Sequence, residues 1–390
     1  MPEFREASGY SIVSAILPRH TSAEVMERAL LSKGFNAIST NARGTLLKDR
    51  WYQSFLPVLS PEQTVAEVVV PNEAVDGIME KIVSAGKLSL SGAGAIYSVR
   101  CTDVMVSDQY PLMESESIDT ETSNSGLNVK EDLVGIFCIA QPEDSDAICR
   151  AAVQAGAPGP TVYYCEGRGL RDRLLLLRIT KTAEKELIQV IVDPVDADPV
   201  FSAIAEAGRL SEPGRGIVYR VPIAKGLINV ASVYGRTKHS ASIQQIVAAL
   251  DDLSGSSEWR AQAVTKKERK PGSRTAFPFL GLGMNEKYLE GLVMLTCITN
   301  RKYSAMLTNR ALAAGAPAAS VAVGKFYEAD AETTTTGARL NRERGLIKMM
   351  LSPARCAEIR GTLLEAANEN SINEIGFFTY SVPRALTYLG

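Results

Sequence analysis

The chain has 390 residues, 45% of them apolar, and its 42 basic and 44 acidic residues leave a formal net charge of −2. This length predicts two to four domains, and the balanced charge excludes an overall field that would favour nucleic acid or an anionic membrane. No apolar run approaches the roughly 20 residues of a membrane helix.

The N-terminus lacks the basic-then-apolar order of a signal peptide, so none is predicted. Six isolated cysteines, without a Cys-x-x-Cys pair, indicate neither a zinc site nor a disulfide framework. We therefore expect a cytoplasmic protein in which Cys138 and Cys297 are small buried side chains. His20 and His239, the only histidines, lie in different segments, so the sequence predicts no metal site.

The first quarter of the chain has a mixed strand and helix pattern. Strands are predicted over residues 10–17, 35–40, 65–70 and 95–101. One helix is predicted to begin at Thr21, which has capping-box spacing to Glu24, and a second to begin at Asn72 and end at Gly86. A long polar loop runs from the second strand to about residue 63. The order strand, helix, strand, strand, helix, strand is that of a ferredoxin-like unit.

This pattern recurs along the chain at constant offsets. The stretch AGKLSLSGAGAIYSV at residues 85–99 returns as AGRLSEPGRGIVYRV at residues 207–221, an offset of 122. The strand LVGIFCI around Cys138 returns as LVMLTCI around Cys297, an offset of 159. Repetition of this kind indicates a duplicated structural unit. The third copy keeps the strand and helix signals, but ENSINEI at residues 369–375 replaces its glycine turn.

The offsets divide the chain into five segments. Three repeats cover residues 8–110, 131–231 and 288–390. Residues 111–130 form a polar, acidic linker, and residues 232–287 form a connector with one amphipathic helix over 242–253. The basic stretch TKKERKPGSR in that connector is interpreted as a solvated tether rather than a nucleic-acid patch, because it lacks interleaved aromatic residues.

The repeated unit resembles the PII signalling proteins and their PII-like relatives over about four fifths of the chain. The resemblance rests on the element order, on the long loop between the second and third strands, on the bends Arg43-Gly44 and Gly167-Arg168-Gly169 at the base of that loop, and on the turn AGK…GAGAIY. The chain departs from the family pattern after the second glycine of this turn. Ala95 and Ile217 stand there in place of the usual basic residue.

The resemblance implies an α+β fold: three tandem ferredoxin-like (βαββαβ) PII-like domains that form a single-chain pseudo-trimer. In the family, adenine nucleotides lie in clefts between neighbouring subunits. The resemblance therefore implies ATP, ADP or AMP as an effector, with no cofactor required, between two neighbouring units of this chain.

The candidate ligand-binding residues combine glycine turns with basic side chains. Gly-x-Gly lets backbone N–H groups approach an anion closely, and an arginine can bind phosphate bidentately. The candidates are Arg43, Gly44, Lys87, Gly92, Gly94, Arg168, Gly169, Arg209, Gly214, Arg215, Gly216 and Lys325. Alternatively, the glycines only form tight turns, and the bases at the helix ends only offset the helix dipole. Arg43, Arg168 and Lys325 are predicted to occupy equivalent ends of the second strands. Because Asn370 and Glu369 replace the glycine and the base of the third turn, we expect at most two of the three clefts to bind a nucleotide.

Three hypotheses for function remain open. The first is a non-catalytic PII-like sensor that binds an adenine nucleotide, with or without a small anion, and signals through its long loops to a partner such as a transporter or metabolic enzyme. The second is an adaptor of the same fold that has lost the ligand. The third is an enzyme such as a nucleotide hydrolase, although the sequence shows no set of acid, base and nucleophile. On any of these hypotheses the chain is expected to be a monomeric pseudo-trimer or a dimer of it, not embedded in a membrane.

Overall fold

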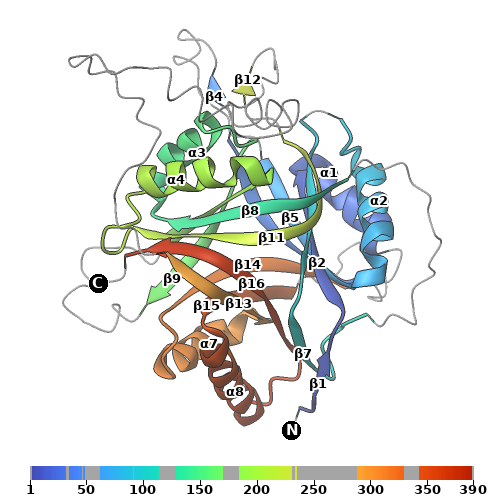
Figure 1. The fold of residues 1–390 in the computed structure, drawn as a ribbon. Coiled ribbons are helices and arrows are strands. Elements are labelled where there is room, and N and C mark those ends of the chain that lie inside the picture. Colours follow the sequence, from blue (N-terminus) through green and yellow to red (C-terminus); the bar gives the residue numbers. More distant parts are fainter. Residues whose placement is uncertain are drawn as a thin grey trace, which may run out of the picture.

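The computed structural model describes residues 2–31, 35–45, 47–48, 62–90, 92–113, 129–169, 184–230, 233–234, 288–328 and 342–388. Within them, the order strand, helix, strand, strand, helix, strand occurs three times. We call these runs unit 1 (residues 10–107), unit 2 (130–229) and unit 3 (289–387). In Figure 1 their helix pairs point outward in three directions from a common centre of strands.

The elements of the three units correspond one to one. Unit 1 consists of β2 (Tyr10–Pro18), α1 (Arg19–Val25), β3 (Ala37–Gly44), β5 (Glu62–Pro71), α2 (Val75–Gly86), β6 (Gly94–Arg100) and the additional β7 (Asp103–Ser107). Unit 2 consists of β8 (Lys130–Ala140), α3 (Ser145–Gln154), β9 (Thr161–Gly169), β10 (Glu184–Val192), α4 (Ala197–Ala207) and β11 (Gly216–Asn229). Unit 3 consists of β13 (Leu289–Asn300), α7 (Arg301–Ala313), β14 (Ala318–Tyr327), β15 (Arg342–Leu351), α8 (Pro353–Glu369) and β16 (Ile375–Thr387). Shorter strands are β1 (Phe4–Ala7), β4 (Leu47–Lys48) and β12 (Val233–Tyr234).

Each unit folds its four main strands in the same antiparallel order: second, third, first, fourth. The registers also match. Ser14 lies opposite Glu67 and Tyr97, Phe137 opposite Gln189 and Tyr219, and Thr296 opposite Lys348 and Phe378. The sequence offsets of 122 and 159 therefore correspond to equivalent places in three dimensions on the third and last strands of each unit.

The units are joined edge to edge in a closed cycle. The chain after the last strand of each unit pairs with the last strand of another unit: Gly226 with Tyr97, Ala385 with Tyr219, and Val104 with Phe378. These three pairings are again related by 122 and 159. The second strands β3, β9 and β14 also pair with one another. The result is one continuous sheet of 14 strands.

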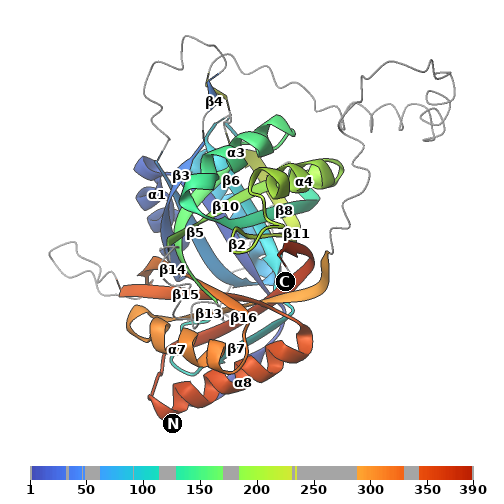
Figure 2. The same cartoon turned by 90° about the vertical axis from the view of Figure 1, so that its left-hand side faces the viewer.

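The part of the sheet that each unit contributes is buried on both faces. On β2, Ile12 and Ile16 point into a core shared by all three units, whereas Val13 and Ala15 point toward the helices of unit 1. The helix pairs of units 2 and 3 cover their own sheets in the same way, and Figure 2 shows α7 and α8 on the outer face of unit 3. Burial on both faces explains why the first strands are almost continuously apolar.

Two helix starts were predicted incorrectly from the sequence. Helix α1 begins at Arg19 after Pro18, and the Thr21 hydroxyl donates to the Pro18 carbonyl over 3.1 Å, so the capping box with Glu24 is not formed. Asn72 does not cap α2, because its side chain accepts a hydrogen bond from the Ser11 hydroxyl over 2.7 Å. It lies instead in a 3₁₀ turn, Asn72–Ala74, that leads into the helix.

Other predictions about single elements have mixed outcomes. Cys138 and Cys297 have no exposed surface, which confirms that they are buried. Two predicted features lie outside the described residues: most of the linker at 111–130, and the helix at 242–253 with its basic tether.

Candidate functional site

Three equivalent junctions lie where the second strand of one unit ends against the first helix of the next, and a cavity is described at the third of them. We call each junction a cleft and name it by its units. In the 1/2 cleft, Arg43 of β3 reaches Asp146 of α3. In the 2/3 cleft, Arg168 of β9 reaches Asn309 of α7. In the 3/1 cleft, Lys325 of β14 lies beside α1.

The base in the 1/2 cleft is held by carboxylates. The Arg43 guanidinium is 3.3 Å from Asp146 and 2.9 Å from Glu186. Burial alone would lower the pKa of Arg43, but these two carboxylates, Glu186 foremost, raise it above its ordinary value. An anion entering this cleft would have to compete with two negative charges for one cation.

The 3/1 cleft has lost these acids and is open. Thr64 stands at the position of Glu186, and Ala23 at the position of Asp146, so neither position carries a charge. A polar cavity of about 160 Å³ remains there, and its lining includes Arg19, Ser22, Ser39, Asn41, Thr64 and Lys325. Among the described residues, no carboxylate forms an ion pair with Lys325, while Arg19 pairs with the exposed Glu62 at 2.9 Å. This cleft therefore offers an unneutralised ammonium group among hydroxyl and amide groups.

The prediction that Arg43, Arg168 and Lys325 occupy one strand position is wrong for Arg168. Arg43 lies opposite Glu62 and Lys325 opposite Glu343, whereas the matching place in unit 2 holds Glu166, opposite Glu184. Arg168 is two residues farther along, 3.5 Å from Asn309 and 3.5 Å from Glu166. The glycines beside Arg43 and Arg168 lie in strand pairing between units: Gly44 opposite Thr161, and Gly169 opposite Ala318.

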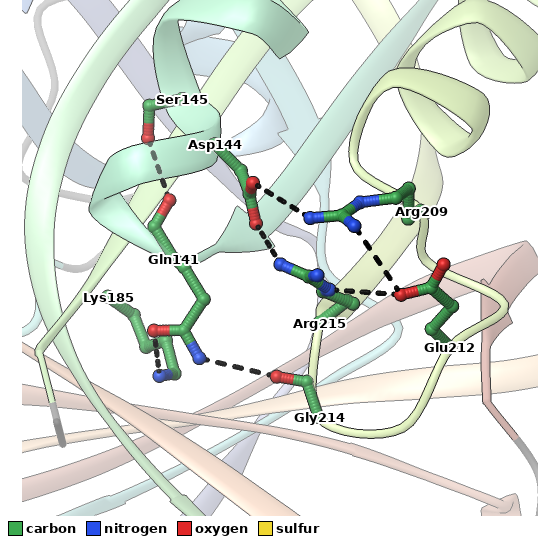
Figure 3. A network of polar contacts seen from close by, with 8 residues as sticks. All are labelled: Gln141, Asp144, Ser145, Lys185, Arg209, Glu212, Gly214 and Arg215. Atoms are coloured by element: carbon green, nitrogen blue, oxygen red, sulfur yellow. Dashed lines mark hydrogen bonds and ion pairs between the residues drawn. The ribbon is translucent and has the colours of Figure 1, made fainter. Parts of the chain in front are cut away.

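In the second glycine turn, both arginines form ion pairs with acidic residues of their own unit (Figure 3). Asp144 is 3.9 Å from Arg209 and 3.3 Å from Arg215, and Glu212 is 3.9 Å and 3.2 Å from the same two residues. The turn is also tied to its own unit through Gln141, whose side-chain amide donates to the Gly214 carbonyl over 3.3 Å. The charges of Arg209 and Arg215 are thus balanced by those of Asp144 and Glu212.

The first glycine turn is clamped by unit 2. The Gly92 N–H donates to the Asn229 carbonyl over 2.7 Å, and the Asn229 side-chain amide donates to the Leu88 carbonyl over 2.6 Å. Lys87 has a left-handed backbone with φ of 50°, and its side chain is exposed. At least one N–H group of this turn is thus already used within the protein.

Glycine is required at positions 94 and 216 by the backbone itself, without any ligand. Their φ angles are 135° and 144°. A Cβ atom at these positions would lie 2.1 Å from the Ile16 carbonyl oxygen and 2.0 Å from that of Ile139. Any side chain here would collide with the neighbouring strand.

The third turn differs from the sequence-based alignment. Ser371, with φ of 50°, takes the left-handed place of Lys87 and Arg209, and the buried residue that follows each of them is Ile372 in this unit. The prediction that Glu369 replaces the base was therefore wrong. From this residue to the last strand the third turn spans four residues (375 − 371), against seven in the second (216 − 209), so it has no room for a Gly-x-Gly loop.

Sequence reasoning missed a polar group at the centre of the molecule. Glu67, Gln189 and Lys348 occupy equivalent places on the third strands and line a cavity of about 50 Å³ between the three sheets. Lys348 lies 3.7 Å from Glu67, and the Tyr97 hydroxyl donates to Gln189 over 3.1 Å. Burial raises the pKa of Tyr97 above its ordinary value, and Glu67 adds to this shift. Applying the two sequence offsets to the third strands would have revealed this set.

Comparison with known proteins finds a family model that matches part of the chain. The model of the family described as nitrogen regulatory protein P-II matches residues 134–227, which is almost all of unit 2. A solved structure of Arabidopsis thaliana PII bound to citrate is 19% identical, with 24% of this chain and 80% of that chain covered and a TM-score of 0.19. A microcompartments protein from Desulfitobacterium hafniense DCB is 15% identical, with coverages of 55% and 94% and a TM-score of 0.15. Aspartate kinase from Synechocystis is 7% identical, with coverages of 98% and 53% and a TM-score of 0.20.

The fold thus contains antiparallel α+β units of the ferredoxin type, with their clefts at the strand ends. Residues 134–227, within unit 2, match the P-II family model and make this unit PII-like. Among the described residues, no helix has both the length and the apolar character needed to cross a membrane. The same residues contain no cluster of three or more His, Cys, Asp or Glu side chains that could hold a metal ion.

Proposed function

We propose that all three units are PII-like domains and that the protein is a single-chain, non-catalytic counterpart of a PII trimer. The equal registers within the units and at their three junctions support this interpretation. The six cysteines are free, which fits the reducing cytoplasm where we propose that the protein acts.

The proposed effector is a phosphate-bearing anion, with an adenine nucleotide as the first candidate, bound in the 3/1 cleft. One observation carries this proposal: among the described residues, Arg43 pairs with Asp146 and Glu186, and Arg168 pairs with Glu166, whereas Lys325 forms no ion pair with a carboxylate. The hydroxyls of Ser22, Ser39 and Thr64 line the same cavity. A cationic, hydroxyl-lined cavity suits a phosphate group better than a cleft whose base is already paired.

Signalling would follow from the position of the cleft. Lys325 lies three residues before the end of the described part of unit 3 at Glu328, where the segment joining β14 to β15 begins. An anion bound at Lys325 therefore contacts the base of this segment. A ligand that binds one arrangement of the segment more tightly shifts the population toward it, and a partner such as a transporter or metabolic enzyme would bind that arrangement.

Titration calorimetry with ATP, ADP, AMP and citrate tests the effector proposal. We expect saturable heat for at least one nucleotide, abolished by Lys325→Gln. The matched control is Arg43→Gln, which removes the equivalent base of the acid-lined 1/2 cleft and should leave binding unchanged. Gly94→Ala is unsuitable, because its Cβ would damage the fold. Equal loss with Lys325→Gln and Arg43→Gln would refute the assignment to the 3/1 cleft.

The alternative function is an adaptor that binds a partner without a ligand. Two observations favour it: Arg209 and Arg215 are neutralised by Asp144 and Glu212, and Asn229 fills the first turn. Absence of binding heat with every nucleotide and with citrate would favour the adaptor over the sensor.

A further inference from the structure

The chain carries different charges at one equivalent place where each unit pairs with another. Asp103, Lys225 and Arg384 are related by the offsets 122 and 159, and they directly precede Val104, Gly226 and Ala385 of the junction pairings. In a trimer of identical subunits the same residue would occupy all three places. Here one place is acidic and two are basic.

Each of these residues forms an ion pair with the second helix of the unit on which it docks. Lys225 of unit 2 lies 2.7 Å from Asp76 on α2 of unit 1. Arg384 of unit 3 lies 3.3 Å from Asp198 on α4 of unit 2. At the third junction the polarity is reversed, because Asp103 of unit 1 pairs with Arg360 on α8 of unit 3.

The centre of the molecule shows a second, independent asymmetry. The equivalent third-strand positions carry an acid, a neutral amide and a base: Glu67, Gln189 and Lys348. Their side chains line one cavity, and the acid and the base pair at 3.7 Å. One copy of each unit brings a compensated set of charges to this place.

Other associations would bring like charges together. If unit 1 docked on unit 1 of other chains, Asp103 would face Asp76, and three copies of Glu67 would meet at the centre. If unit 3 docked on itself, Arg384 would face Arg360, and three copies of Lys348 would meet. Like charges facing each other disfavour an interface strongly at the buried centre and more weakly at each junction, where the partners are more exposed.

The junction charges also distinguish the two possible cyclic orders. In the reverse order, Asp103 would dock near Asp198, and Lys225 near Arg360, so two of three junctions would be repulsive. Only the third, Arg384 near Asp76, would remain attractive. The observed order makes all three junctions attractive.

We propose that these two sets of charges form an assembly code that admits one copy of each unit in a single cyclic order and excludes exchange of units 1 and 3 between chains. The code is needed because the joining segments, residues 108–129 and 230–288, are long. Closure of a longer segment costs only slightly more entropy, so segment length alone selects weakly between a neighbour in the same chain and one in another chain. Unit 2, whose Lys225, Asp198 and Gln189 are compatible with copies of themselves, is the only unit that the code does not protect.

Refolding of the full-length protein tests this proposal. The code-erased variant combines Asp103→Lys and Arg360→Asp, which keep an ion pair at that junction but give it the polarity of the other two, with Glu67→Gln and Lys348→Gln at the centre. A second variant carries only the two junction changes and keeps the central pair. The matched control inverts an ion pair within α8, Arg355→Glu with Glu358→Arg, whose partners lie 2.6 Å apart in one unit.

Each protein is refolded from denaturant over a wide range of protein concentration and its mass is measured by sedimentation velocity. We expect wild type and control to return to the mass of one chain. The code-erased variant should give a several-fold larger fraction of dimers and larger species, rising with concentration, and the junction variant an intermediate fraction. If either variant, folded by circular dichroism, returned to the mass of one chain as completely as wild type at every concentration, the proposal would be overturned. A rise in larger species in the control as well would overturn it too, because the effect would then not belong to the junctions.

Discussion

The ion pair at the centre gives the sharpest test of the packing described here. Lys348 and Glu67 have only 12% and 20% of their side chains exposed and lie 3.7 Å apart. At an effective dielectric constant of about 20, two unit charges at this distance attract by roughly 4.5 kcal/mol. Desolvation of both groups offsets most of that gain, so the pair adds little net stability. Removing one partner, however, leaves an uncompensated buried charge.

We therefore expect Lys348→Met to lower the free energy of unfolding by about 3 kcal/mol, because Glu67 then loses the opposite charge beside it at the buried centre. Glu67→Gln should cost a similar amount, since it leaves the Lys348 ammonium unpaired. The double variant should lie within about 1 kcal/mol of wild type, because no charge is left without a partner.

Urea unfolding followed by circular dichroism measures these differences, provided that the four proteins share one m-value. Arg19→Gln is the control, because the Arg19–Glu62 pair is well exposed and should contribute less than about 1 kcal/mol. If the cost of the double variant equalled the sum of the two single costs, the two charges would not be coupled, and the description of the centre as a compensated pair would be wrong.

Three further predictions concern separate features. Gly216→Ala should destabilise the protein by about 3 kcal/mol or more in thermal unfolding, because its Cβ would lie 2.0 Å from the Ile139 carbonyl oxygen. The control Gly361→Ala, which has open space in α8, should stabilise the protein by up to about 1 kcal/mol. Equal effects of the two substitutions would contradict the close contact at Gly216. Burial raises the pKa of the Cys149 thiol to about 11 and that of Cys165 to about 12. Their contribution to stability is therefore complete below the unfolded thiol pKa of about 8.5 and is lost as the pH rises toward 11. Urea midpoints that did not change between these two pH values would contradict this prediction. Asn229→Ala removes the side-chain bond to the Leu88 carbonyl but keeps the backbone carbonyl that accepts from Gly92. It should loosen the first turn and speed hydrogen exchange at the Gly92 amide without affecting the second turn, and unchanged exchange would show that the side-chain bond does not hold the turn.

The repeats made much of the fold predictable. A constant offset between similar segments requires similar units, and strand and helix signals inside each unit were strong because both faces of each sheet are buried. The lengths of the last strands were predicted poorly. β11 runs to Asn229, far beyond the predicted end at Val221, because its second half pairs with unit 1. Such pairing depends on a partner more than a hundred residues away and leaves little local pattern.

The candidate site was predictable only in its basic residues. The sequence singled out Arg43, Arg209 and Arg215, but not the carboxylates that hold them. Asp144 and Glu212 come from different elements, and only the folded turn brings both within reach of the two arginines. Whether a base is available for a ligand is set by such neighbours, so residue type and spacing alone could not rank the clefts.

Fusion of three units into one chain removes a constraint that symmetry imposes. Three identical subunits must place the same residue at all three equivalent positions, so any acid that closes one cleft closes every cleft. In this chain the equivalent positions diverge: Glu186 and Thr64 flank different clefts, and only the second leaves its base, Lys325, unneutralised. The same divergence balances the charges at the centre and at the junctions. An effector that recognises the unneutralised base should therefore bind once per chain, and a titration that saturates at three equivalent sites would show that the clefts had not diverged in function.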